Sequence, residues 1–134
     1  MLSRRLTLWA LGYGVLIWFE AALTIRLLGS YIFRPTDLPW MALIFAGTAI
    51  LAYAIGYFYF QWFQTTPPQR AASALVICAV GLLGNTVVLM QPAFFFPGMT
   101  QEQLAWFAAW FAWGYGLGLL SGIWPTRLPR VPVE

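Results

Sequence analysis

The segment LPWMALIFAGTAILAYAIGYFYFQWF, residues 38–63, decides the fold class, because it contains no charged side chain. The hydrocarbon core of a bilayer is roughly 30 Å thick, and about 20 residues of helix cross it. Charged residues make up only 8% of the whole chain, whereas soluble domains contain about 25%. We therefore expect an integral membrane protein whose main partner is the lipid bilayer.

Three further apolar blocks are long enough to cross a bilayer. The sequence predicts membrane spans at residues 6–33, 38–63, 70–91 and 102–124. Backbone groups in lipid must form hydrogen bonds within their own segment, so the spans are expected to be helices. Together they predict a single all-α domain over residues 1–134, arranged as an antiparallel up-down bundle of four transmembrane helices.

The arginines predict the orientation of this bundle. All seven basic residues are arginine. If the N-terminus is inside, the inner side carries Arg4, Arg5, Arg70, Arg127 and Arg130, and the outer side carries Arg26 and Arg34. The positive-inside rule then places both termini in the cytoplasm. Trp9, Trp62 and Trp124 fall at the inner interface, where aromatic belts form.

Two charged residues interrupt the first span, in IWFEAALTIRLLG at residues 17–29. Arg26 lies about 30 Å along the helix from Leu6, at the opposite interface, where its long side chain can reach headgroups or water. Glu20 lies roughly 9 Å short of that point and has a shorter side chain. An ionised carboxylate in hydrocarbon is costly. Glu20 is therefore expected to be protonated, hydrogen-bonded within the bundle, or open to a water-filled cavity.

A partner for Glu20 follows from chain spacing. Glu20 comes 15 residues after Arg5, and Asn85 comes 15 residues after Arg70. The first and third helices run in the same direction, so both side chains are expected about 22 Å deep. We therefore predict a hydrogen bond between Glu20 and Asn85.

Other polar and aromatic side chains are expected at the same depth, on all four helices. The predicted cluster contains Glu20, Thr24, Thr48, Asn85, Trp110 and Trp113. Two interpretations remain open. The cluster is a binding or proton-linked site, as intramembrane acids often are, or it only ties helices together, at about 0.6 kcal/mol per hydrogen bond.

Glycines recur at four-residue spacing in the last span, WFAAWFAWGYGLGLLSGIW at residues 106–124. Gly114, Gly118 and Gly122 share one helix face, and small residues allow two helices to approach closely. This face is predicted to pack against another helix of the chain or to form a homodimer.

Several function classes are disfavoured. The chain has no histidine, which argues against the usual zinc and haem sites. Its one cysteine, Cys78, has no neighbouring base, and no carboxylate pair has helical spacing. Scattered arginines do not make a nucleic-acid surface. We expect no enzymatic activity, no catalytic residue, no metal and no cofactor.

Three motifs carry a family resemblance. TIRLLG (24–29), FPG (96–98) and WGYGLGLLSG (113–122) resemble an uncharacterised bacterial family of short four-span membrane proteins, known only as a domain of unknown function. The resemblance implies the four-span fold and supplies no activity.

The chain also resembles the small multidrug resistance transporters in architecture. They too have four spans, and an essential Glu in the first span is followed by Thr one turn later, as Glu20 and Thr24 are here. This resemblance implies exchange of protons for cationic aromatic drugs within a dimer. Arg26 departs from that pattern, because its positive charge in the same helix would repel cationic drugs.

Two functional hypotheses follow. The first is a non-enzymatic membrane protein that packs with itself or with a partner, as a homodimer or in a larger membrane complex, and has an accessory or structural role. The alternative is a proton-coupled small-solute transporter that works as a homodimer through Glu20. Dry, apolar surroundings of Glu20 would favour the first hypothesis, and a cavity that reaches Glu20 would favour the second.

Overall fold

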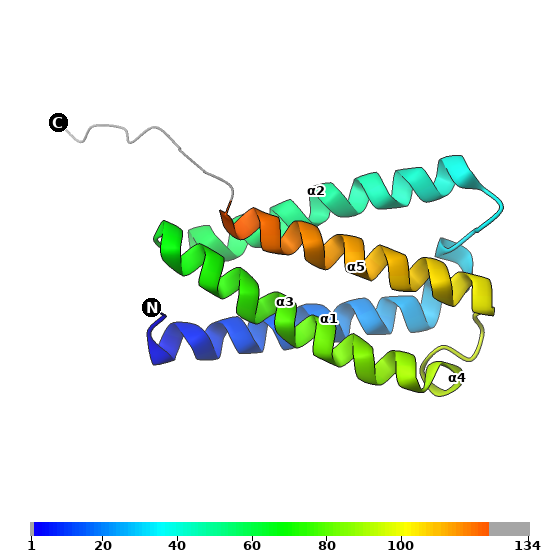
Figure 1. The fold of residues 1–134 in the computed structure, drawn as a ribbon, viewed down its shortest axis with the longest axis horizontal. Helices are drawn as coiled ribbons and strands as arrows, with labels where there is room; N and C mark the ends of the chain where they lie inside the picture. The colour runs from blue at the N-terminus through cyan, green and yellow to red at the C-terminus, as the bar shows by residue number, and fades with distance from the viewer. Residues whose placement is uncertain (1, 124–134) are drawn as a thin grey trace.

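The computed structural model describes residues 2–123, which form a bundle of helices (Figure 1). Its elements are α1 (Arg4–Ile32), α2 (Leu38–Trp62), α3 (Pro67–Met90), the short α4 (Pro92–Phe95) and α5 (Gln101–Ile123). The four long helices are each long and apolar enough to cross a membrane. The predicted all-α fold with four membrane helices is confirmed. Residue 124, the predicted end of the last span, lies outside the described residues.

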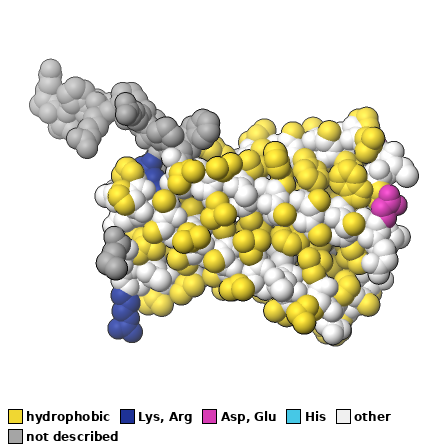
Figure 2. All heavy atoms as spheres, in the orientation of Figure 1, with side chains coloured by type: hydrophobic (Ala, Val, Ile, Leu, Met, Phe, Trp, Pro, Cys, Tyr) yellow, Lys and Arg dark blue, Asp and Glu magenta, His cyan; other side chains and the backbone are white. Residues whose placement is uncertain are grey.

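The bundle has two ends. We call the end near residues 4, 62, 67 and 123 the N-terminal end, and the end near residues 32, 38, 90 and 101 the distal end. In Figure 2 a largely hydrophobic surface separates basic side chains at one end from acidic side chains at the other. The described basic residues at the N-terminal end are Arg4, Arg5 and Arg70. This distribution suits a chain whose middle lies in hydrocarbon.

Side chains at the helix starts explain where two of the helices begin. The side chain of Gln69 accepts a hydrogen bond of 3.0 Å from the backbone amide of Thr66. Thr100 and Gln103 exchange two such bonds, of 2.9 and 3.2 Å. Both starts have the Thr-x-x-Gln pattern of a capping box, whose hydrogen bonds satisfy amide groups that a helix start leaves without partners.

The four long helices are packed in the order α1–α3–α5–α2. We call this sequence of contacts the packed arc. Although α1 and α2 are consecutive in the chain, they are not packed against each other along their length, and in the view of Figure 1 α5 runs between them. We call the gap between them the open side. Near the N-terminal end it is bridged by the Tyr13 hydroxyl, which donates to the carbonyl oxygen of Ile55 at 3.3 Å.

Glycines explain why α1 approaches α3 so closely. A Cβ atom on Gly14 would lie 3.0 Å from the carbonyl oxygen of Ile77. A Cβ on Gly84 would lie 2.5 Å from the indole of Trp18. Only glycine leaves room for these contacts, which is the usual role of small residues between membrane helices.

The interface between α3 and α5 is also built on small residues. A Cβ on Gly118 would lie 2.9 Å from the Cys78 sulfur, and one on Gly122 would lie 2.6 Å from the Cβ of Ala74. A Cβ on Gly114 would instead lie 3.4 Å from the Thr48 side chain of α2. The glycine face of α5 therefore packs within the chain, Gly118 and Gly122 against α3 and Gly114 against α2.

The buried core is divided into two clusters. The distal cluster consists of Ile25, Phe33, Met41, Val88, Phe96, Leu104 and Phe107. The N-terminal cluster consists of Ala10, Tyr59, Phe60 and Ala74. The packed arc therefore has a solid core near each end, and the middle of the bundle is filled differently.

Candidate functional site

A cavity of about 420 Å³ lies in the middle of the bundle, between the two core clusters. All four long helices line it, including the α1 and α2 residues that flank the open side. We call it the central cavity. Five of the six residues predicted as a polar cluster line it: Glu20, Thr24, Thr48, Asn85 and Trp110. The structure therefore brings together residues that lie up to 90 positions apart in the chain.

Glu20 is exposed at the wall of this cavity. Its carboxylate accepts a hydrogen bond of 3.2 Å from the hydroxyl of Thr24, one turn further along α1. Tyr13, Ile17, Glu20 and Thr24 follow one another at spacings of 4, 3 and 4 and so share one face of α1. Since Tyr13 reaches across to α2, this face is turned toward the open side. Glu20 thus lies where the cavity and the open side meet.

The opposite wall holds two hydrogen-bonded pairs. The indole of Trp110 donates to the hydroxyl oxygen of Thr48 at 2.6 Å, and that hydroxyl donates to the carbonyl of Ile44 at 2.8 Å. The amide of Asn85 donates to the hydroxyl of Tyr115 at 3.4 Å. These bonds fix the polar groups of α2, α3 and α5 and leave the Glu20 carboxylate as the acidic group of the lining.

The predicted hydrogen bond between Glu20 and Asn85 is not formed. Each side chain has another partner, Thr24 for Glu20 and Tyr115 for Asn85. The reason is the direction that each helix face takes around its axis. Asn85 is 5% exposed and faces α5, whereas Glu20 faces the open side. Both residues line the central cavity, but they do not contact each other.

Trp113 does not line the central cavity, contrary to the prediction. It is 46% exposed, and its indole donates to the carbonyl of Phe45 at 3.1 Å. Trp110 and Trp113 are three residues apart and therefore about 60° apart around α5. That rotation is enough to put Trp110 inside the bundle and Trp113 on its outside.

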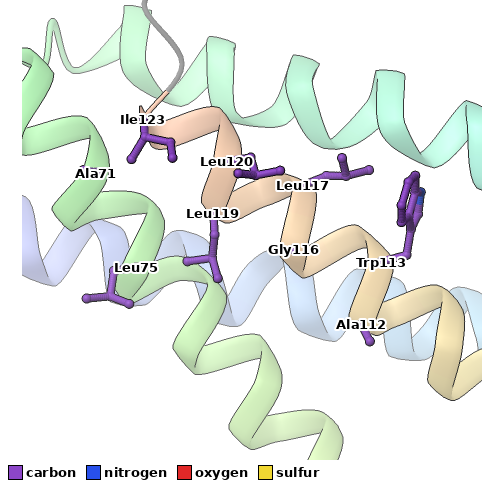
Figure 3. A pocket seen from close by; sticks show the side chains of 9 residues that line it. All are labelled: Ala71, Leu75, Ala112, Trp113, Gly116, Leu117, Leu119, Leu120 and Ile123. Atoms are coloured by element: carbon purple, nitrogen blue, oxygen red, sulfur yellow. The ribbon is translucent and has the colours of Figure 1, made fainter.

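A second hollow, the outer groove, lies on the outside of α5 (Figure 3). Its volume is about 650 Å³, and Trp113, Gly116 and Leu120 are among the residues that line it. Every lining side chain is apolar or a glycine. A groove of this composition in a membrane suits lipid chains or another helix and offers no group for chemistry.

Arg26 is directed away from the central cavity. One of its terminal nitrogens donates to the carbonyl oxygens of Phe94 and Phe95, at 2.9 and 2.8 Å. These carbonyls lie at the end of α4, where a helix leaves acceptors without partners. Arg26 was predicted at the interface, where it reaches headgroups. The structure gives it a protein partner at the distal end, because the sequence did not reveal α4.

Tyr115 is a polar residue of the cavity that was not predicted from the sequence. It packs against Gly81 of α3 and receives the hydrogen bond from Asn85. Its signal was present, since Gly81 and Asn85 lie on the same helix face and leave room for one large polar partner. Within residues 2–123 no group of His, Cys, Asp and Glu side chains could hold a metal ion. The site therefore offers hydrogen bonds, aromatic faces and one carboxylate.

The fold and the central cavity define a four-span integral membrane protein. The sequence pattern of the family of unknown function DUF5367 matches residues 32–127, which is more than half of the chain. The chain belongs to this family. Two of the three motifs noted above, FPG and WGYGLGLLSG, fall within the matched residues, whereas TIRLLG and Glu20 precede them. No curated protein and no solved structure matches the chain.

Proposed function

We propose that this protein binds a small apolar cation in the central cavity, in exchange for a proton on Glu20, and carries it through the membrane without chemical conversion. The single observation that supports this proposal is the cavity that reaches the Glu20 carboxylate in the middle of the bundle. A role limited to helix packing would not need a carboxylate there, because a neutral polar residue forms the same hydrogen bonds at lower cost.

The lining of the cavity suits such a ligand. Trp110, Phe107, Phe111 and Tyr115 supply aromatic rings, whose faces attract cations. The objection that Arg26 would repel a cation is weakened by its geometry. Its guanidinium group is engaged by the carbonyls of Phe94 and Phe95 and does not line the cavity.

The exchange follows from the cost of a bare charge in hydrocarbon. An ionised Glu20 must be neutralised by a proton or by a cation, and one carboxylate cannot hold both. Binding of the cation then releases a proton, and raising the proton concentration displaces the cation. This competition couples the two without any further residue.

Binding of tetraphenylphosphonium to the purified protein in lipid nanodiscs tests the proposal. We expect wild-type protein to bind it more tightly at pH 8.5 than at pH 5.5 and to release protons on binding. Glu20→Gln should lose this pH dependence. Glu102→Gln, at the exposed start of α5, is the matched control and should behave as wild type. Equal binding at both pH values, or unchanged pH dependence in Glu20→Gln, would refute the exchange.

A second candidate is the accessory role of a homodimer that packs through the outer groove. The large apolar hollow on α5 favours it. Gly116 lines that groove, and a Cβ there would meet no atom within 4 Å, so Gly116→Phe fills the groove without disturbing the chain. A loss of dimer in this variant, measured by cross-linking in membranes, would support the packing role. Unchanged oligomeric state would assign the groove to lipid.

We also propose that the protein lies in a bacterial inner membrane with both termini in the cytoplasm. Arg4, Arg5 and Arg70 at the N-terminal end support this orientation. The predicted contributions of Trp124, Arg127 and Arg130 lie outside the described residues. A reporter that is active only in the cytoplasm should be active when it is fused after Glu134. Activity on the outer side would reverse the topology.

A further inference from the structure

Two buried hydroxyl groups at the N-terminal end have no hydrogen-bond partner within residues 2–123. They are the hydroxyls of Tyr59 and Ser73, whose residues are 1% and 0% exposed. The two hydroxyls lie close to each other, on α2 and α3, although they do not have the geometry of a hydrogen bond. A buried hydroxyl without a partner is destabilising, so native proteins pair such groups with protein or with water.

A third hydroxyl lies beside them. The ring of Tyr13, on α1, is 5.0 Å from the ring of Tyr59 between centroids. Its hydroxyl donates to the carbonyl of Ile55, which leaves its oxygen able to accept another hydrogen bond. Three helices thus bring three hydroxyl-bearing side chains together, and a buried water usually has two to four polar partners.

This hydroxyl site lies directly below the central cavity. Each of its residues has an isoleucine one turn closer to the distal end on the same helix, and all three isoleucines line the cavity: Ile17, Ile55 and Ile77. One turn of helix is about 5.4 Å. A single apolar layer therefore separates the hydroxyls of Tyr13, Tyr59 and Ser73 from the cavity in which Glu20 lies.

The other boundaries of the cavity do not supply water. The open side faces the hydrocarbon of the bilayer, which contains none. At the distal end Phe33, Phe96 and Phe107 are all buried. The ring centroid of Phe107 lies 5.1 Å from that of Phe96 and 6.0 Å from that of Phe33. The N-terminal end is the boundary where polar groups converge.

We infer that Tyr13, Tyr59 and Ser73 form a buried water-binding site, and that water reaches the Glu20 cavity through it from the N-terminal end. The inference deepens the proposed function and rests on it for its meaning, because this water is the route by which protons reach and leave Glu20. A proton then moves along the site as each water or hydroxyl oxygen accepts one proton and passes another on, so that no other reactant is consumed.

Water contact can be measured without any ligand, by water-edited solid-state NMR in lipid bilayers. Tyrosine labelled at Cζ and glutamate labelled at Cδ report on the two places, and Tyr59→Phe and Glu20→Gln assign the signals. We expect rapid polarisation transfer from water to both Tyr59 and Glu20. Ser73→Val, which replaces a hydroxyl by methyl groups, should reduce both transfers several-fold and leave that of lipid-facing Tyr53 unchanged.

Thermal unfolding gives a second, independent measurement. If water pairs with the hydroxyl of Tyr59, then Tyr59→Phe removes good hydrogen bonds and should lower the melting temperature. If that hydroxyl is dry and unpaired, the same substitution should raise it. Tyr53→Phe is the matched control on the same helix and should change nothing.

Each result has a separate meaning. No transfer from water to Tyr59, or a raised melting temperature in Tyr59→Phe, overturns the water site. Transfer to Glu20 that persists in Ser73→Val overturns the route. Neither experiment uses the cation, so a failure of tetraphenylphosphonium binding would refute the exchange and leave the water site to be decided by these measurements.

Discussion

Helix α1 meets its two neighbours in opposite ways. Toward α3 it presents Gly14 and Trp18, and the backbones come so close that a Cβ on Gly14 would lie 3.0 Å from a carbonyl oxygen. Toward α2 it presents Glu20 and Thr24 across the open side, where the helices are not packed. The tight contact holds the fold, whereas the loose one exposes the acid. Stability and the proposed function are therefore carried by different faces of one helix.

The largest effect is expected at the tight contact. Gly14→Leu places a side chain against the backbone of Ile77, which cannot move aside, and should cost about 3 kcal/mol of unfolding free energy. Denaturant titration in detergent measures it. Gly12→Leu, on the same helix with no atom within 4 Å of its Cβ, is the control and should stay within about 0.5 kcal/mol of wild type. Equal effects would remove the distinction between the two sides of α1.

A smaller loss is expected further along the packed arc. The Cβ of Gly118→Leu would meet the sulfur of Cys78, a side-chain atom that can shift, so we expect a cost of about 2 kcal/mol. Gly116→Leu, two residues away, meets no atom within 4 Å and should be nearly neutral. If both variants melt at the wild-type temperature, α5 is not held against α3 in the way that the structure describes.

At the wall of the cavity the expected effect is smaller again and concerns one hydrogen bond. Asn85→Leu removes the partner of the half-buried Tyr115 hydroxyl and should cost about 1 kcal/mol. Thr86→Leu changes the neighbouring exposed residue on α3 and is expected to have little effect. Chemical unfolding of both variants compares the cavity wall with the lipid-facing surface.

The smallest effect is expected at the open side. Both Glu20→Gln and Glu20→Leu should unfold within about 0.5 kcal/mol of wild type, because Asn85 keeps its bond to Tyr115 and a costly acid is lost from the membrane. The hydrogen bond to Asn85 that the sequence predicted would make the loss larger for Glu20→Leu, because Asn85 would then be left without a partner. A measured loss of more than about 1 kcal/mol would favour that direct pairing after all.

The contrast between the two sides of α1 also shows what the sequence determines. Length and apolar runs predicted the four helices, and the Thr-x-x-Gln patterns at Thr66 and Thr100 coincide with two of their starts. A rise of 1.5 Å per residue then predicted which residues share a depth. Glu20, Thr48 and Asn85, on three different helices, do line one cavity.

The order of the helices around the bundle could not be predicted in this way. Depth says nothing about the direction in which a side chain points around the helix axis, so Asn85 was paired with Glu20 when its partner is Tyr115. For the same reason Trp113 was predicted inside the bundle, although it lies on the outside, three residues from Trp110. Arg26 was predicted to reach the headgroups, because the sequence did not reveal the four-residue helix α4, whose carbonyls accept its hydrogen bonds.

The order α1–α3–α5–α2 has a consequence for how the protein is made. Membrane helices first insert singly or in pairs and then associate. Here α1 packs against α3 and α2 packs against α5. When the first two helices emerge from the ribosome, neither packing partner has yet been synthesised. The end of α1 is completed only after α5 has been synthesised, because the side chain of Gln103 donates to the carbonyls of Ser30 and Phe33. The bundle therefore assembles late, and a nascent chain that stops before α5 leaves α2 alone in the lipid.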